Sequence, residues 1–95
     1  MPAYLVVESE ITDPAKFEPY RALAPVAVAK FGGRYLARGG SPEAVENGWA
    51  PQRITIVEFP SREVAKKFYD SPEYKKAREA RAGAAHFKMT IIDGV

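Results

Sequence analysis

Apolar side chains alternate with polar or smaller ones in four segments of the chain, and this period of two is typical of β-strands. In the first segment, Leu5 and Val7 would lie on one face of the strand, and Tyr4, Val6 and Glu8 on the other. The pattern therefore predicts strands at residues 3–9, 34–39, 53–59 and 86–93.

Apolar residues between the first two strands recur at helical spacing from Phe17 to Phe31. Asp13 suits the N-cap of this helix and Pro14 its first position, where a missing N–H has no consequence. Gly32 suits the end of the helix, and Pro25 is expected to kink or interrupt it because proline removes a backbone hydrogen bond.

The segment between the third and fourth strands contains two helix starts. Ser61 and Ser71 each suit an N-cap, Pro72 follows the second of them, and Gly83 suits the stop. The order β-α-β-β-α-β is that of the ferredoxin-like fold, an α+β class with a four-stranded antiparallel sheet and the helices on one face. Right-handed crossovers place the first and third strands in the centre of the sheet.

The helices can cover only one face of this sheet, so the second face must be polar or must be buried by a partner. We expect this helix-free face to combine apolar and charged side chains in about equal numbers. Apolar patches of this extent are rarely left in water, and the pattern predicts a homodimer formed by sheet-to-sheet packing. The expected residues are Tyr4, Val6, Glu8, Arg34, Leu36, Arg38, Ile54, Ile56, Glu58, His86, Lys88 and Ile92.

The 95 residues fit a single domain spanning 1–95, and their charge excludes some classes of partner. Fourteen basic and 12 acidic residues give a net charge of +2, too balanced to indicate nucleic acid or a membrane. No apolar run approaches the ~20 residues of a membrane span, and the N-terminus lacks the pattern of a signal peptide. The sequence contains no cysteine, and we expect a cytoplasmic protein.

Glu58 stands near the end of a strand that otherwise looks buried. We expect Glu58 and Glu8 at comparable positions on neighbouring central strands, with Arg34 or Arg38 close by. A buried carboxylate without a partner is costly, so Glu58 must be paired, solvated or raised in pKa. Two interpretations follow: an ion pair that orients the dimer interface, or an acid or base in a cavity between two sheets, with Arg38 holding an anionic ligand.

Three further residues are candidates for that cavity. Tyr4 and Trp49 could shape it, although Trp49 could equally be a packing anchor in its loop. His86 is the only histidine, and it suits a surface position at least as well as a ligand contact. With one histidine and no cysteine, we predict neither a metal site nor a cofactor.

The other aromatic and glycine residues carry simpler interpretations. Tyr20, Tyr35 and Tyr74 are assigned to the core or its rim. The pair Gly39–Gly40 is interpreted as a turn, without the spacing of a phosphate-binding loop.

Three stretches, "FGGRYLARGG" (31–40), "RITIVEFPS" (53–61) and "DSPEYKKAREAR" (70–81), resemble the bacterial family called domain of unknown function 1330 (DUF1330). The resemblance covers nearly the whole chain. It implies the dimeric α/β-barrel variety of the ferredoxin-like fold, in which two sheets close face to face. The acidic-glycine loop motif of the family is represented here by "VENGW", with Asn47 between Glu46 and Gly48.

The sequence leaves two functions open. In one, the dimer binds or transforms a small anionic organic molecule between its sheets by acid–base chemistry without a cofactor. In the other, the protein is a non-catalytic ligand-binding or structural module, and the same charges fix the interface. The sequence does not decide whether the protein is an enzyme.

Overall fold

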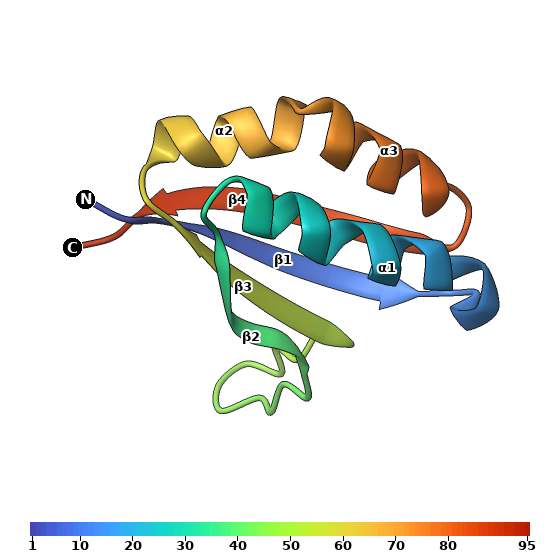
Figure 1. Cartoon of the computed structure of the whole chain (residues 1–95). Helices are drawn as coiled ribbons and strands as arrows, with labels where there is room; N and C mark the ends of the chain where they lie inside the picture. The colour runs from blue at the N-terminus through green and yellow to red at the C-terminus, as the bar shows by residue number, and fades with distance from the viewer.

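The structure is a computed structural model that describes residues 1–95. The elements are β1 (Ala3–Ile11), α1 (Pro14–Lys30), β2 (Arg34–Gly40), β3 (Arg53–Phe59), α2 (Arg62–Asp70), α3 (Pro72–Ala80) and β4 (Ala85–Asp93). The sheet has the strand order β2-β3-β1-β4, and all neighbouring strands are antiparallel. This order confirms the ferredoxin-like fold with β1 and β3 in the centre, and the helices all lie on one side of the sheet (Figure 1).

Helix α1 begins as the sequence predicts and continues past its internal prolines. The Asp13 carboxylate accepts a hydrogen bond of 3.1 Å from the backbone N–H of Lys16. Pro25 was expected to kink or interrupt the helix, but α1 is unbroken from residue 14 to residue 30. Its buried face packs on the sheet through Phe17, Ala24, Ala27 and Val28, and such packing outweighs one lost backbone bond.

Ser71 divides the second helical segment into α2 and α3. Its hydroxyl donates to the carbonyl of Phe68 (2.7 Å) and accepts from the N–H of Tyr74 (3.1 Å). The same side chain therefore ends one helix and caps the next, and Pro72 occupies the first turn of α3.

The core lies between the helices and the central strands. Leu5 and Val7 of β1 and Val57 and Phe59 of β3 are buried there, as the alternation in these strands predicts. The helices contribute Ala24, Ala27, Val28, Ala65, Phe68, Tyr74 and Ala77 to the same cluster.

Strand β2 departs from simple alternation. Tyr35 pairs with Val57 and Ala37 pairs with the next residue of β3, Ile56, so Leu36 is an extra residue in the ladder. Such a β-bulge changes which face the following side chains take. Arg38 consequently pairs with Thr55 and contributes to the lining of a helix-side cavity together with Leu5 and Val57. The prediction that Arg34 and Arg38 share the helix-free face is therefore wrong.

The loop between β2 and β3 extends beyond the sheet, away from the helices (Figure 1). Val45 and Trp49 in this loop are largely exposed, at 94% and 67%. None of the three helices is both long and apolar enough to cross a bilayer.

Candidate functional site

A cavity of about 70 Å³ lies between α1 and the helix-covered face of the sheet. Most of its lining is apolar, and its polar groups are phenols, hydroxyls and guanidinium groups. The lining residues are Leu5, Val7, Ser9, Phe17, Tyr20, Arg21, Ala24, Val28, Tyr35, Arg38, Arg53, Thr55, Val57, Phe68, Tyr74 and Phe87. An apolar hollow with a few convergent polar groups is the usual form of a small-molecule site.

Three arginines from three different elements contribute to this lining. Arg21 comes from α1, Arg38 from β2 and Arg53 from the first position of β3. Neither Arg38 nor Arg53 takes part in any of the ion pairs of the structure, and Arg21 has only the exposed Glu18, at 3.5 Å. The cavity therefore carries an excess of positive charge.

The excess of positive charge affects the pKa of Arg53. Its own burial and the positive charges of Arg21 and Arg38 lower the pKa of the Arg53 guanidinium below its usual value. The charges of Arg21 and Arg38 disfavour the charged form of Arg53, and a bound anion would relieve this repulsion.

Gly39 leaves room for the side chain of Arg53. Its φ of +65° is readily adopted only by glycine, and a side chain at this position would overlap the guanidinium of Arg53. The N–H of Gly39 also donates to the hydroxyl of Thr55 at 3.0 Å. The glycine interpreted as a turn residue thus lies within β2, beside Arg53 and Thr55, which line the cavity.

Phenol groups provide further polar atoms of the cavity. The hydroxyls of Tyr20 and Tyr74 lie 2.6 Å apart, and the guanidinium of Arg38 stacks 4.6 Å above the centre of the Tyr35 ring. Burial is the main cause that raises the pKa of all three tyrosines, and the proximity of Tyr20 to Tyr74 adds to the rise for Tyr20. These phenols remain protonated at neutral pH and can donate hydrogen bonds.

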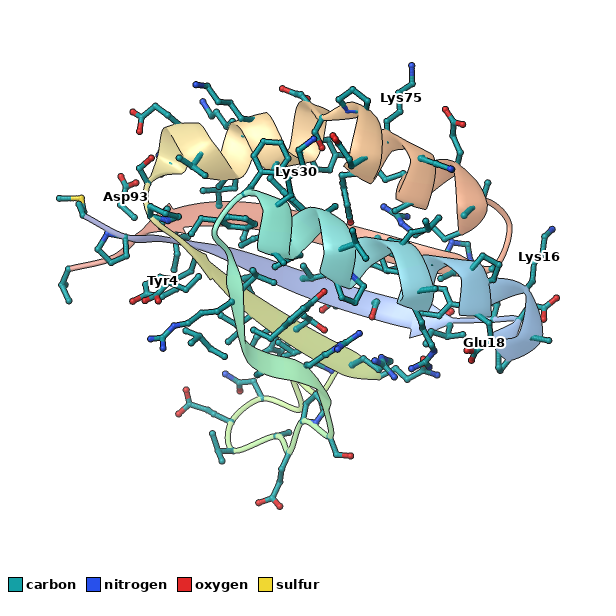
Figure 2. All side chains as sticks on the ribbon, viewed as in Figure 1. Tyr4, Lys16, Glu18, Lys30, Lys75 and Asp93 are labelled. Carbon is teal, nitrogen blue, oxygen red and sulfur yellow. The ribbon has the colours of Figure 1, made fainter.

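Glu58, the predicted acid or base, lies on the other face of the sheet. Its carboxylate accepts a hydrogen bond of 2.8 Å from the Nε–H of Arg34. Tyr4 is the residue opposite Glu58 on β1, and Figure 2 shows its side chain near the end of the molecule where both termini lie. The structure thus brings three predicted site residues together, but away from the cavity.

Glu8 is not at a position comparable to that of Glu58. Glu8 lies opposite Ile54, whereas Glu58 lies opposite Tyr4, so the two carboxylates are four residues apart along the paired strands. At the rise of a β-strand this separation is roughly 13 Å, which corrects the expected cluster. Glu8 instead lies 3.9 Å from the ammonium of Lys88, which is opposite it on β4.

Trp49 and His86 meet at a separate place. Together with Glu8 and Lys88 they line an open hollow of about 470 Å³ at one end of the sheet. Trp49 is mostly exposed and does not line the helix-side cavity. The predicted site residues therefore lie in three places. Glu58, Arg34 and Tyr4 form one group, Glu8, Trp49 and His86 form a second, and Arg38 alone lines the helix-side cavity.

The sequence interpretation did not select Arg21, Arg53, Tyr20 or Tyr74. Arg53 could have been noticed as a charged residue at the start of a largely apolar central strand. Tyr20 and Tyr74 are 54 residues apart, and no local pattern links them. No group of three or more histidine, cysteine, aspartate or glutamate side chains is placed to hold a metal ion.

Comparison with solved structures supports the fold. A protein of unknown function from Rhodopseudomonas palustris superposes with a TM-score of 0.79 at 15% identity, covering 99% of this chain and 82% of that one. A dimeric ferredoxin-like protein of unknown function from Jannaschia sp. CCS1 gives 0.73 at 10% identity, covering 99% and 100%. SnoaB, a cofactor-independent oxygenase from Streptomyces nogalater, gives 0.66 at 12% identity, covering 99% and 93%.

Sequence comparison gives the family. Among proteins with curated descriptions, none matches this chain. The family model described as "Domain of unknown function (DUF1330)" matches residues 2–95, which is nearly the whole sequence. The resemblance noted from the three sequence stretches is thus confirmed, and the chain belongs to the DUF1330 family.

Proposed function

We propose that the protein is a homodimer in which each chain binds a small carboxylate in the cavity between α1 and the sheet. The observation that carries this proposal is the cluster of Arg21, Arg38 and Arg53 around an apolar hollow, with a single exposed carboxylate among their partners. The planar fork of a guanidinium matches a carboxylate in geometry as well as in charge. The apolar lining would take the organic part of the ligand.

The lining favours binding over acid–base catalysis. Its ionisable groups are three arginines and three phenols with raised pKa, so it contains no carboxylate or imidazole to act as a base. The hypothesis that Glu58 is an acid or base requires a second cavity, between the two sheets of the dimer. Because Glu58 is already bound to Arg34, we favour the helix-side cavity as the ligand site.

The helix-free face supports the dimer. Val6, Ile54 and Ile56 form an apolar centre on the two middle strands, with Ile56 directly opposite Val6. The ion pairs Arg34–Glu58 and Lys88–Glu8 lie on either side of this centre. An apolar centre with a charged rim is typical of protein interfaces, and two neighbours of the same fold are described as dimeric. Light scattering should then report twice the 10.5 kDa of one chain.

Two arginines on one strand give a matched test of the ligand site. Arg38→Met removes a charge from the cavity, while Arg34→Met removes the same charge from the opposite face of β2. Isobutyrate and butyrate would be titrated in a thermal-shift assay and by calorimetry, with inorganic phosphate as an anion that has no apolar part. A hydrogen bond to a charged group contributes about 1.5–3 kcal/mol, so Arg38→Met should weaken carboxylate binding by about 10- to 100-fold.

Arg34→Met should leave carboxylate affinity within a factor of two or so, because its side chain does not contact the cavity. Equal losses in the two variants would argue against the helix-side cavity. If no small carboxylate binds to the unmodified protein, the proposal fails, and the function as a structural dimer module remains.

A further inference from the structure

The hydroxyls of Tyr20 and Tyr74, two residues that line the cavity, are hydrogen-bonded to each other. Tyr20 projects from α1 and Tyr74 from α3, which pack side by side on the sheet (Figure 1). Their oxygens are 2.6 Å apart, and either group can be the donor. Tyr74 is almost completely buried, at 1% exposure, whereas Tyr20 is only partly buried.

The pair has one hydrogen more than it can share. Each phenol carries one hydrogen and can also accept, so the contact between Tyr20 and Tyr74 uses one hydrogen of the two. The second hydrogen has a single candidate acceptor among the protein atoms. This acceptor is the sulfur of Met89, 3.9 Å from the Tyr74 hydroxyl. A thioether is a weak acceptor. The nearby guanidinium of Arg81, which lies 5.4 Å from the centre of the Tyr20 ring, can only donate.

Two arrangements of these hydrogens are therefore close in energy. In one, Tyr20 donates to Tyr74, and Tyr74 donates to the Met89 sulfur. In the other, Tyr74 donates to Tyr20, and the hydroxyl of Tyr20 is free to donate to a ligand in the cavity. The change between them gives up only the weak contact with sulfur, and donation along a chain strengthens the last bond.

From this geometry we infer that the ligand is a short oxo carboxylic acid, whose carboxylate binds the arginines and whose ketone oxygen accepts a hydrogen bond from Tyr20. The inference rests on the proposed function, because it takes the arginine cluster as the carboxylate site. Tyr20 is the direct donor because the Tyr74 hydroxyl lies beside the Met89 sulfur, and because the Tyr20 residue is partly exposed whereas Tyr74 is almost completely buried. Tyr74 is a positioning residue that orients the Tyr20 hydroxyl.

The size of the cavity limits the ligand. Its volume of about 70 Å³ is about half that of the ~150 Å³ cavity that holds a benzene ring. The enclosed part thus has space for a chain of roughly three or four carbon atoms, with the carboxylate at the arginines. A ring system would exceed this space. Short aliphatic oxo acids fit the chemistry and the volume together.

Matched pairs of acids test the ketone contact. The probes are 3-oxobutanoate with 3-methylbutanoate, and 4-oxopentanoate with 4-methylpentanoate. Within each pair a methyl group replaces the ketone oxygen, and the number of non-hydrogen atoms is the same. The two oxo acids have three and four carbon atoms beyond the carboxylate, which matches the space in the cavity. We expect calorimetry on the unmodified protein to show about three- to tenfold tighter binding of the oxo acid in at least one pair.

Tyr20→Phe should abolish or reverse that preference, because a buried ketone would be left without a donor, while binding of the methyl acid should persist. Tyr69→Phe is the control, since this phenol bonds Arg78 and does not line the cavity. It should keep the preference. Circular dichroism would establish that both variants are folded.

The outcomes separate this inference from the proposed function. If both acids of each pair bind equally well and both need Arg38, the carboxylate site stands and the contact with Tyr20 is refuted. A preference for the oxo acid that survives Tyr20→Phe also refutes it. If neither type of acid binds at either chain length, the carboxylate site is wrong and the inference is wrong with it.

Discussion

The two faces of the sheet differ in whether their charged side chains have partners of opposite charge. On the helix-free face, Arg34 is bonded to Glu58 and Lys88 lies beside Glu8. On the helix-covered face, Arg38 and Arg53 line a cavity without an acidic partner. Strand β2 supplies one arginine to each face, and a β-bulge between them makes the difference.

This difference suggests that the two faces have different roles, one in assembly and one in ligand binding. Paired charges around an apolar centre add specificity to an interface and leave little for a ligand to gain. Repulsion among three positive charges around a hollow lowers the stability of the unliganded fold. A bound anion removes this repulsion, and the relief adds to the free energy of anion binding. We therefore expect assembly to depend on the helix-free face and ligand binding on the helix-covered one.

The largest effect should come from a charge placed at the centre of the helix-free face. Ile56→Glu puts a carboxylate opposite Val6 in the proposed interface, twice in each dimer. An uncompensated buried charge costs about 3–5 kcal/mol, so light scattering should report a single chain at micromolar concentration. Carboxylate binding in the cavity should persist, because the substitution lies on the other face of β3.

Val26→Glu is the control for this change. Val26 lies on α1, is 67% exposed and would receive the same charge, and it should leave assembly unaltered. A dimer that survives Ile56→Glu would place the interface elsewhere. Assembly and carboxylate binding lost together, in a variant that circular dichroism shows to be folded, would mean that the faces are not independent.

The next effect concerns Gly39, which lies against the guanidinium of the cavity residue Arg53. Gly39→Ala imposes a side chain at a φ of +65° and against Arg53, so we expect a loss of about 1–3 kcal/mol in unfolding free energy and weaker carboxylate binding. Gly40→Ala is the matched control on the next residue, where an added Cβ has open space. Urea denaturation and calorimetry would compare the two. Equal effects of the two substitutions would contradict the role given to Gly39.

The fold was predictable because its signals are local. Asp13, Ser61 and Ser71 all cap helices as the sequence indicates, and alternation gives the buried faces of β1 and β3. The face of Arg38 was not predictable from alternation, because one extra residue at Leu36 reverses it. A bulge depends on how a strand pairs with its neighbour, here β3, and no local pattern in β2 indicates that pairing.

The cavity was harder to foresee than the fold. Glu58 is a candidate site residue in the sequence because a charge near the end of an apolar strand is unusual. In the structure, its hydrogen bond with Arg34 explains why a carboxylate occupies this position. The tyrosine pair joins α1 to α3, and each phenol alone fits a core position. Tertiary packing, rather than a motif, creates the hydrogen-bonding group.

A smaller effect should appear at alkaline pH, and it belongs to the helix-covered face. Burial raises the pKa of Tyr20, so the folded chain keeps this proton while the unfolded chain releases it near pH 10. The unfolded state then binds fewer protons, and stability falls as the pH rises above about 10. Between pH 9 and 11, Tyr20→Phe should reduce this fall by about 1 kcal/mol, measured by urea denaturation. An unchanged fall would mean that Tyr20 is not protected in the folded chain.

The smallest effect should come from Glu58. Its partner Arg34 is 71% exposed, and such surface pairs contribute less than about 1 kcal/mol. Glu58→Gln should therefore lower the unfolding free energy only slightly and leave carboxylate affinity unchanged. A double-mutant cycle with Arg34→Met would isolate the pair, since the glutamine should have no further effect once the arginine is gone. If Glu58→Gln instead abolishes ligand binding or a measured turnover, the site extends across both faces, and Glu58 regains the role of acid or base in a cavity between the sheets.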